Sequence, residues 1–188
     1  MCQNKLLKIL LIASTIASLS YDTFYEFYPA YLTGVWHTTP LQIAWYTVML
    51  SVAIGIGCGW LSFSLTRFFK SRQLILTSVA TIAVVLTALL FAPPLWLLLI
   101  LFVIIGFALG VATPHYTLQV SEAAESHIQG EVFGTLWGLR MLLDGTISIV
   151  GGFLLIVAYQ LPIAIAATAA LFAWIVYSHV KSIKSFPH

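Results

Sequence analysis

Six long apolar stretches constrain the fold of this sequence more than any motif does. A helix needs about 20 mainly apolar residues to cross the hydrocarbon core of a bilayer, and windows of that length identify six segments. They cover residues 6–31, 41–66, 73–92, 95–119, 131–158 and 161–180. We therefore expect an all-α, polytopic membrane protein in which residues 1–188 form a single domain of six transmembrane helices.

The composition supports a membrane setting and excludes several other classes of protein. Charged residues make up only 7% of the chain and hydrophobic residues 61%, with a mean hydropathy of +1.01, whereas soluble domains carry about 25% charged residues. We therefore expect the lipid bilayer to surround the chain. The net charge of +2 is too small to indicate a nucleic-acid partner. Cys2 and Cys58 form no metal-type or disulfide spacing and no His-Glu-x-x-His pattern occurs, so we expect no metal and no cofactor.

Lysine and arginine determine the expected orientation in the membrane. Seven of the eight basic residues fall in segments that six spans would place on one side: Lys5, Lys8, Arg67, Lys70, Arg72, Lys181 and Lys184. Positively charged loops stay in the cytoplasm, so we expect both termini to be cytoplasmic and the membrane to be a bacterial inner membrane. The first 20 residues also resemble a signal peptide, but their apolar character continues to Tyr31, beyond the usual length of such a signal.

Four ionisable residues lie inside the predicted spans. Asp22 and Glu26 fall in the first span, and Arg140 and Asp144 fall in the fifth. A charge at the centre of a bilayer costs roughly 2.5–3.5 kcal/mol, so each of these groups needs a partner or a water-filled cavity. Residues four apart share one face of a helix, so Arg140 could neutralise Asp144 along its own helix.

Aromatic residues accompany both charged pairs. Tyr25 lies on the charged face of the first span, and Phe133 and Trp137 continue the charged stripe of the fifth. Because aromatic faces can stack on a cationic or aromatic solute, these three residues are candidate contacts in a substrate cavity. A second aromatic group, near the predicted outer boundary, is interpreted as an interfacial belt. It comprises Tyr28, Tyr31 and Trp36.

Glycines recur at short spacings in the second, fourth and fifth spans. They are Gly55, Gly57, Gly59, Gly106, Gly110, Gly130, Gly134 and Gly138. Small residues let helices approach closely in lipid, although glycine is also common in transmembrane helices in general. We expect tight helix packing at these positions.

Three stretches of the chain carry a recognisable pattern. They are YDTFYEFYPAYL (21–32), GFALGVATP (106–114) and SEAAESHIQGEVFGTLWGLRMLLDGTISIVGGFLL (121–155). In that order they resemble the start of the seventh helix, the tenth helix, and the eleventh helix with its preceding loop in the major facilitator superfamily. The likeness is to the drug:proton antiporter branch that includes tetracycline exporters. It implies that the chain is the carboxy-terminal half of the facilitator fold, one half-bundle of six helices.

A basic loop extends this resemblance. SFSLTRFFKSR (62–72) is similar to the family's G-x-x-x-D-R-x-G-R-K loop, with Arg67 and Lys70 at matching positions and Arg72 just beyond. The resemblance implies a cytoplasmic loop at these three residues. The chain departs from the family pattern at Ser62, Thr66, Phe69 and Ser71.

The resemblance implies a secondary active transporter half that exports a small amphipathic solute or drug in exchange for protons. Helices seven and eleven of the family both line its central cavity, so the charged stripes of the first and fifth spans are expected to meet there. Arg140 would then reach Asp22 or Glu26 across the cavity, and the four charges would form a proton-coupling network. A transporter pathway of this kind lies between two repeats, which implies a second six-helix bundle from the same or another chain.

Other interpretations stay open at this stage. The charges could form a static salt bridge that joins the first and fifth spans. The chain could also be a non-transporting membrane subunit, or a truncated fragment that pairs with another helical bundle. An intramembrane enzyme is not expected, because no serine motif of the Gly-x-Ser-x-Gly type occurs.

Overall fold

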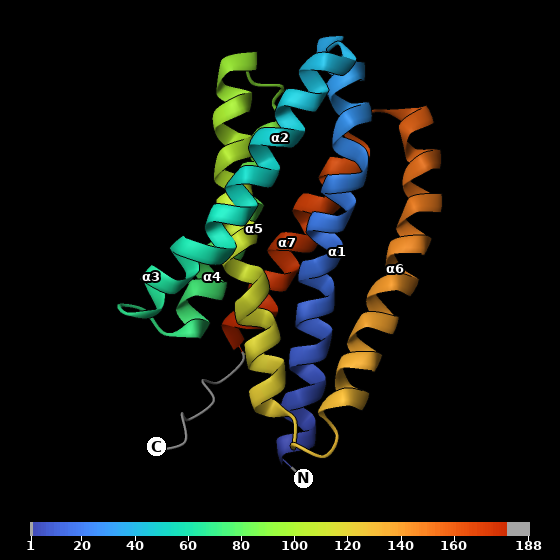
Figure 1. Cartoon of the computed structure of the whole chain (residues 1–188). Helices are drawn as coiled ribbons and strands as arrows, with labels where there is room; N and C mark the ends of the chain where they lie inside the picture. Colours follow the sequence, from blue (N-terminus) through green and yellow to red (C-terminus); the bar gives the residue numbers. More distant parts are fainter. Residues whose placement is uncertain (1, 180–188) are drawn as a thin grey trace.

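The computed structural model describes residues 2–179, which form a bundle of long helices (Figure 1). In this part of the chain six helices are long and apolar enough to cross a membrane, so the expected all-α, six-span fold is confirmed. The long helices are α1 (Cys2–Trp36), α2 (Pro40–Ile56), α4 (Ser71–Leu89), α5 (Leu95–Ala123), α6 (Gln129–Val157) and α7 (Leu161–His179). Residue 180 of the last predicted span, Lys181 and Lys184 lie outside the described residues.

The second span, predicted over residues 41–66, covers Pro40–Thr66 and is not α-helical throughout. α2 is followed by a π-helix, η1 (Gly57–Leu61), and then by α3 (Ser62–Thr66). The change coincides with a close approach to α5, because a Cβ on Gly110 would overlap backbone atoms of Ile54 and Cys58. Hydropathy reports how apolar a helix is and carries no information on its hydrogen-bond register. Hydropathy alone therefore does not predict a π-helical turn.

Among the glycines singled out from the sequence, three in the second and fourth spans pack tightly. A Cβ on Gly57, Gly106 or Gly110 would lie under 3.0 Å from an atom of the facing helix, so these glycines allow α2 and η1 to contact α5. At the remaining positions the predicted packing does not occur within this chain, because no described atom lies within 4 Å of such a Cβ. These are Gly55, Gly59, Gly130, Gly134 and Gly138.

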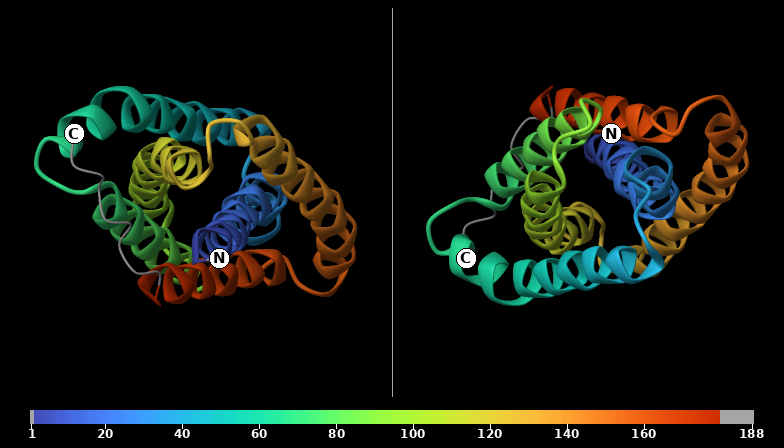
Figure 2. Two further views of the ribbon diagram at one scale, coloured as in Figure 1. Left: turned by 90° about the horizontal axis from the view of Figure 1, so that it is seen from below. Right: turned by 90° about the horizontal axis from the view of Figure 1, so that it is seen from above.

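The helices surround two central ones. Seen along the bundle, α1 and α5 lie in the interior, and the other long helices lie around them (Figure 2). α1 packs mainly against α7 and α6, whereas α5 packs against α2 and α4. α6 lies at one flank of the bundle, and only Val132 and Gly151 of its 29 residues are buried. This helix therefore presents most of its surface to the surroundings of the chain.

Aromatic side chains fill the half of the bundle that contains the α1–α2 and α4–α5 connections. Tyr31 is fully buried and its hydroxyl donates to the carbonyl oxygen of Leu89, while the Trp36 indole donates to the carbonyl oxygen of Pro93 at 3.1 Å. Tyr28 is also buried, with its ring edge-on to Phe102. The interpretation of Tyr28 and Tyr31 as an interfacial belt is therefore wrong. Their rings pack inside the bundle because α1 is a central helix.

A buried histidine joins three helices at the other end. The side chain of His115 on α5 lies 3.2 Å from the Ser62 hydroxyl through Nε2 and 3.1 Å from the Ser71 hydroxyl through Nδ1. Ser62 begins α3 and Ser71 begins α4. His115 thus fixes the turn that carries the basic loop against α5.

Candidate functional site

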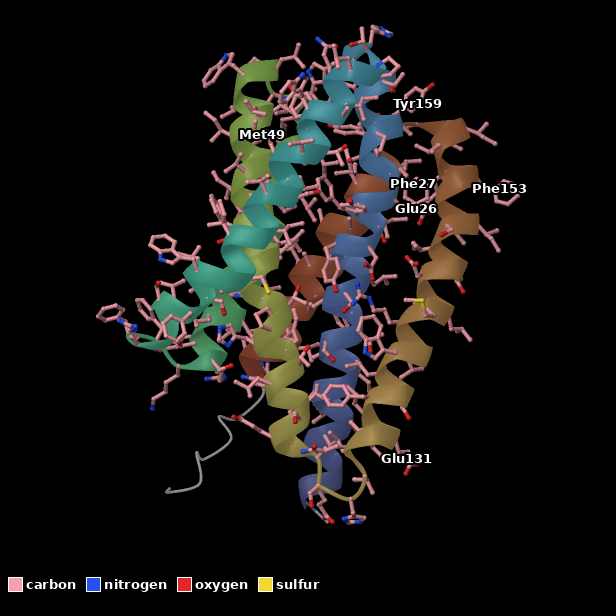
Figure 3. All side chains as sticks on the ribbon, in the orientation of Figure 1. Glu26, Phe27, Met49, Glu131, Phe153 and Tyr159 are labelled. Atoms are coloured by element: carbon pink, nitrogen blue, oxygen red, sulfur yellow. The ribbon has the colours of Figure 1, made fainter. Side chains whose placement is uncertain are left out.

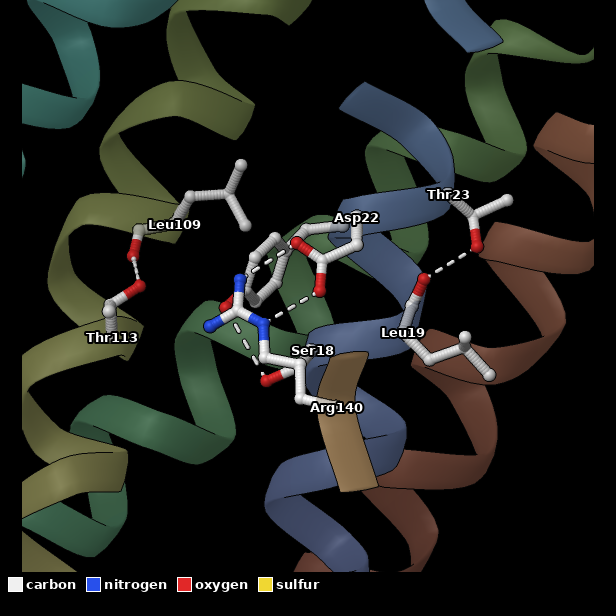
Figure 4. Close-up of polar contacts among 8 residues, drawn as sticks. Ser18, Leu19, Asp22, Thr23, Leu109, Thr113 and Arg140 are labelled. Atoms are coloured by element: carbon white, nitrogen blue, oxygen red, sulfur yellow. Dashed lines mark hydrogen bonds and ion pairs between the residues drawn. The ribbon is translucent and has the colours of Figure 1, made fainter. Parts of the chain in front are cut away.

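An ion pair between α1 and α6 is the centre of the candidate site. Arg140 on α6 donates from Nε to Asp22 Oδ2 at 2.9 Å and from Nη2 to Asp22 Oδ1 at 2.8 Å (Figure 4). The two side chains are only 20% and 17% exposed. A planar guanidinium paired with both oxygens of a carboxylate is the strongest common geometry for such a pair. The two expected charged stripes therefore meet, as the resemblance implied.

Two aromatic rings cover the arginine. The guanidinium carbon of Arg140 lies 4.9 Å from the centre of the Tyr21 ring and 5.0 Å from that of Trp137. Cations are attracted to aromatic faces at such distances. Trp137, predicted to contact substrate, thus contacts Arg140 in this structure. Tyr21 was not singled out from the sequence, although its position directly before Asp22 is a usable signal.

The expected pairing of Arg140 with Asp144 on the same helix is not observed. Long side chains on a helix point back toward its amino terminus, and Asp144 lies on the carboxy-terminal side of Arg140. Arg140 therefore extends away from Asp144 and reaches Asp22 on α1 instead. Among the described side chains, none forms a hydrogen bond or ion pair with the Asp144 carboxylate.

Glu26 has a different partner from Asp22. The Ser148 hydroxyl of α6 lies 2.8 Å from Glu26 Oε2, and it also lies 2.9 Å from the carbonyl oxygen of Asp144. Glu26 points from α1 toward α6 (Figure 3) and is exposed. The sequence did not single out Ser148, because serine is common in such helices and its role depends on a distance across two helices.

The remaining predicted substrate contacts are spread along the α1–α6 face. Tyr25 is 47% exposed, and its ring packs edge-on to Tyr28 at 5.8 Å. Phe133 is half-buried and packs against the hydrophobic core nearest the start of α1. Trp137 lies one turn farther along α6 and is 53% exposed. Tyr25 and Trp137 are therefore accessible to a solute, whereas Phe133 partly supports the core.

The basic loop has contacts of its own and lies apart from the charged pair. Arg67 lies over the Phe63 ring at 4.9 Å, and Arg72 donates to the Ser178 carbonyl oxygen of α7 at 2.9 Å. Lys70 is exposed and precedes α4. No group of three or more His, Cys, Asp or Glu residues in the described part of the chain could hold a metal ion.

Six helices able to cross a membrane, with a partly buried ion pair between two of them, define a multi-pass membrane protein. In such proteins intramembrane charges mark the pathways of ions and solutes. A family model described as "Sugar (and other) transporter" matches residues 8–177, and the chain belongs to this family of the major facilitator superfamily. The predicted superfamily membership is confirmed, and the chain belongs to a family of transporters and not of enzymes.

The relatives that match are efflux proteins. The chain is 29% identical over 154 residues to "Multidrug efflux pump Tap" of Mycolicibacterium fortuitum, which covers 77% of this chain and 37% of that protein. It is 25% identical over 170 residues to the protein of the same name in Mycobacterium tuberculosis, covering 86% of this chain and 40% of the relative. The chain thus spans about two fifths of the length of the curated relatives it matches. No solved structure matches it significantly.

The comparisons also bear on location. Both relatives are mycobacterial proteins, in agreement with the expected bacterial inner membrane. The chain is a multi-pass integral membrane protein of the transporter family.

Proposed function

We propose that this chain, together with a second six-helix bundle, exports a small amphipathic solute in exchange for protons. The observation that carries the proposal is the Asp22–Arg140 pair. It joins α1 and α6, which the resemblance equates with two cavity-lining helices of the family. Glu26 and Asp144 lie beside this pair, and both carboxyls lack a basic partner among the described side chains. We assign proton coupling to these four residues, and contact with the solute to Tyr25 and Trp137, with Phe133 at the margin.

The surface of the chain supports a second bundle. Only Tyr46, Leu50 and Ala53 are buried in the 17 residues of α2, and α6 is even less covered. Gly130, Gly134 and Gly138 recur every four residues on α6 and face open space within this chain. Such spacing lets another helix approach closely in lipid. This chain covers about 40% of the relatives, which are long enough to contain a further bundle.

Transport can be tested with a fluorescent lipophilic cation. We expect cells that express the chain with a complementary six-span bundle to expel ethidium, and a protonophore to stop the efflux. Glu26→Gln should abolish the proton-driven part, because the amide cannot take up a proton at this position. Glu131→Gln is the matched control, since Glu131 is exposed at the first turn of α6, away from the pair (Figure 3). Efflux that persists in Glu26→Gln would contradict proton coupling, and absence of efflux with every bundle would favour a non-transporting subunit.

The proposed orientation, with both termini in the cytoplasm, has its own test. In a background with Cys2→Ser and Cys58→Ser, His37→Cys should react with a membrane-impermeant maleimide added to intact cells. Phe68→Cys should react only after permeabilisation. Both residues are exposed, in the α1–α2 and α3–α4 connections respectively, so access to the reagent depends on the side of the membrane. Labelling of Phe68→Cys in intact cells would reverse the orientation.

A further inference from the structure

An apolar groove lies beside the basic loop, far from the charged pair. Its walls come from η1 and α3, from the first part of α4 and from the middle of α5, and its volume is about 240 Å³. η1, α3 and the start of α4 lie on the opposite flank of the bundle from α6 (Figures 1 and 2). The groove is therefore separate from the candidate site between α1 and α6. Its lining includes Leu61, Leu65, Leu74, Thr77, Ile104 and Phe107.

The lining of this groove favours a slender apolar occupant. Seven of its ten lining residues are apolar. The Thr77 hydroxyl donates to the Gln73 carbonyl oxygen and the Thr81 hydroxyl to the Thr77 carbonyl oxygen, each at 2.9 Å, so both threonines are bonded to their own helix. Pockets for drug-sized solutes have volumes of roughly 300–1,000 Å³, which exceed that of this groove. Thr77 and Ile104 are exposed at its edge, so a hydrocarbon chain can enter from the side.

Positive charge is concentrated next to the groove. Arg67 and Lys70 lie in the connection between the parts of α3 and α4 that line it, and both side chains are exposed. No aspartate or glutamate occurs between residues 27 and 121, and among the described side chains neither Arg67 nor Lys70 forms an ion pair. Arg72, the third basic residue of the loop, donates to a backbone carbonyl of α7. Arg67 and Lys70 are therefore available to an anionic group at the end of the groove.

Exposed aromatic rings indicate that the basic loop lies at the level of the lipid headgroups. Trp60 is 71% exposed and Phe68 is 81% exposed, and the Arg67 guanidinium lies over the Phe63 ring at 4.9 Å. Aromatic and basic residues together are typical of the boundary between hydrocarbon and headgroups. In the proposed orientation this boundary belongs to the cytoplasmic leaflet, which carries the anionic lipids. An occupant that suits both the groove and the loop thus combines a hydrocarbon chain with an anionic headgroup.

We propose that the groove binds one acyl chain of an anionic phospholipid whose phosphate is held by Arg67 and Lys70. Arginine binds phosphate through paired hydrogen bonds, and lysine binds it as a compact charge. A helix of another bundle suits the groove less well, because one turn of a helix about 10 Å across occupies roughly 400 Å³. The lipid would join α3 and α4 to α5. Its binding does not depend on the proposed transport.

Native mass spectrometry of the purified chain, titrated with phosphatidylglycerol or phosphatidylcholine, tests this proposal. We expect phosphatidylglycerol to bind more tightly. Arg67→Gln and Lys70→Gln should each lower its affinity about fivefold, the contribution expected from one basic residue at an anionic surface, and should leave the affinity for phosphatidylcholine unchanged. Thr77→Phe fills the groove from its exposed edge and should weaken the binding of both lipids. Glycerol phosphate, which has no acyl chain, should not displace phosphatidylglycerol.

Two matched variants control for general effects of charge and size. Lys8→Gln removes an exposed basic residue near the start of α1, and Val84→Phe enlarges a side chain of α4 that is 68% exposed and lies outside the groove. Both should bind phosphatidylglycerol like the parent chain. An equal loss in Lys8→Gln and Arg67→Gln would overturn the proposal, since the attraction would then come from diffuse surface charge. Equal affinity for the two lipids, full binding by Thr77→Phe, or displacement of the lipid by a complementary six-span bundle would also overturn it.

Discussion

The double variant Asp22→Asn/Arg140→Met is expected to fold normally and to transport nothing. Each single substitution leaves one charge without its partner, which costs about 3–5 kcal/mol for a fully buried pair. Because these side chains are 17–20% exposed, we expect a loss of about 2 kcal/mol for each single variant. The double variant removes both charges together and should recover most of that loss. Thermal unfolding in nanodiscs measures the stability, and proton-driven ethidium efflux measures the function.

The double variant distinguishes a charge pair that takes part in transport from one that only joins α1 to α6. A bridge that only joins α1 to α6 would be dispensable once both charges are gone, so the double variant would then transport like the parent protein. Arg72→Met provides the matched control for removal of an arginine. Arg72 donates to Ser178 at the end of α7, far along the chain from the pair, and its loss should leave efflux intact. Normal transport by the double variant would remove Arg140 from the proposed mechanism.

The conspicuous parts of this site could be predicted from the sequence. Asp22 and Arg140 stand out because charges are rare and costly in apolar helices. Helix periodicity placed each on a charged stripe, and the family resemblance implied that the two stripes meet. The spacing alone could not predict that Arg140 pairs with Asp22 and not with Asp144. This pairing depends on the direction of the Arg140 side chain and on how close α1 lies to α6.

The features that the sequence did not predict share a physical cause. Ser148 and Tyr21 acquire their roles from distances across α1 and α6, and neither residue type is unusual in a membrane helix. The π-helix at 57–61 results from close packing on α5, a property of two helices together. Likewise, Tyr31 resembles an interfacial residue until α1 is known to be central. Sequence patterns thus predicted the elements and the costly residues, whereas pairwise contacts needed the structure.

Gly110→Ala is expected to destabilise the protein strongly. An added methyl group would overlap the carbonyl oxygen of Ile54 and the backbone nitrogen of Cys58, at the start of the π-helix. Backbone atoms cannot rotate out of the way as side chains do, so α2 and η1 would have to move off α5. We expect a loss of about 3 kcal/mol, the upper end of the usual range for overpacking. Thermal unfolding in nanodiscs, with the recovery of monodisperse protein, measures it.

Gly134→Ala is the matched control for this substitution. Gly134 also lies within a long span, but no described atom lies within 4 Å of the added methyl group. Alanine favours a helix over glycine by about 1 kcal/mol in water, so the stability of the isolated chain should be unchanged or slightly higher. If a second bundle packs on α6, the same variant should lose efflux while the chain stays folded. Equal stability of Gly110→Ala and Gly134→Ala would contradict the close contact between η1 and α5.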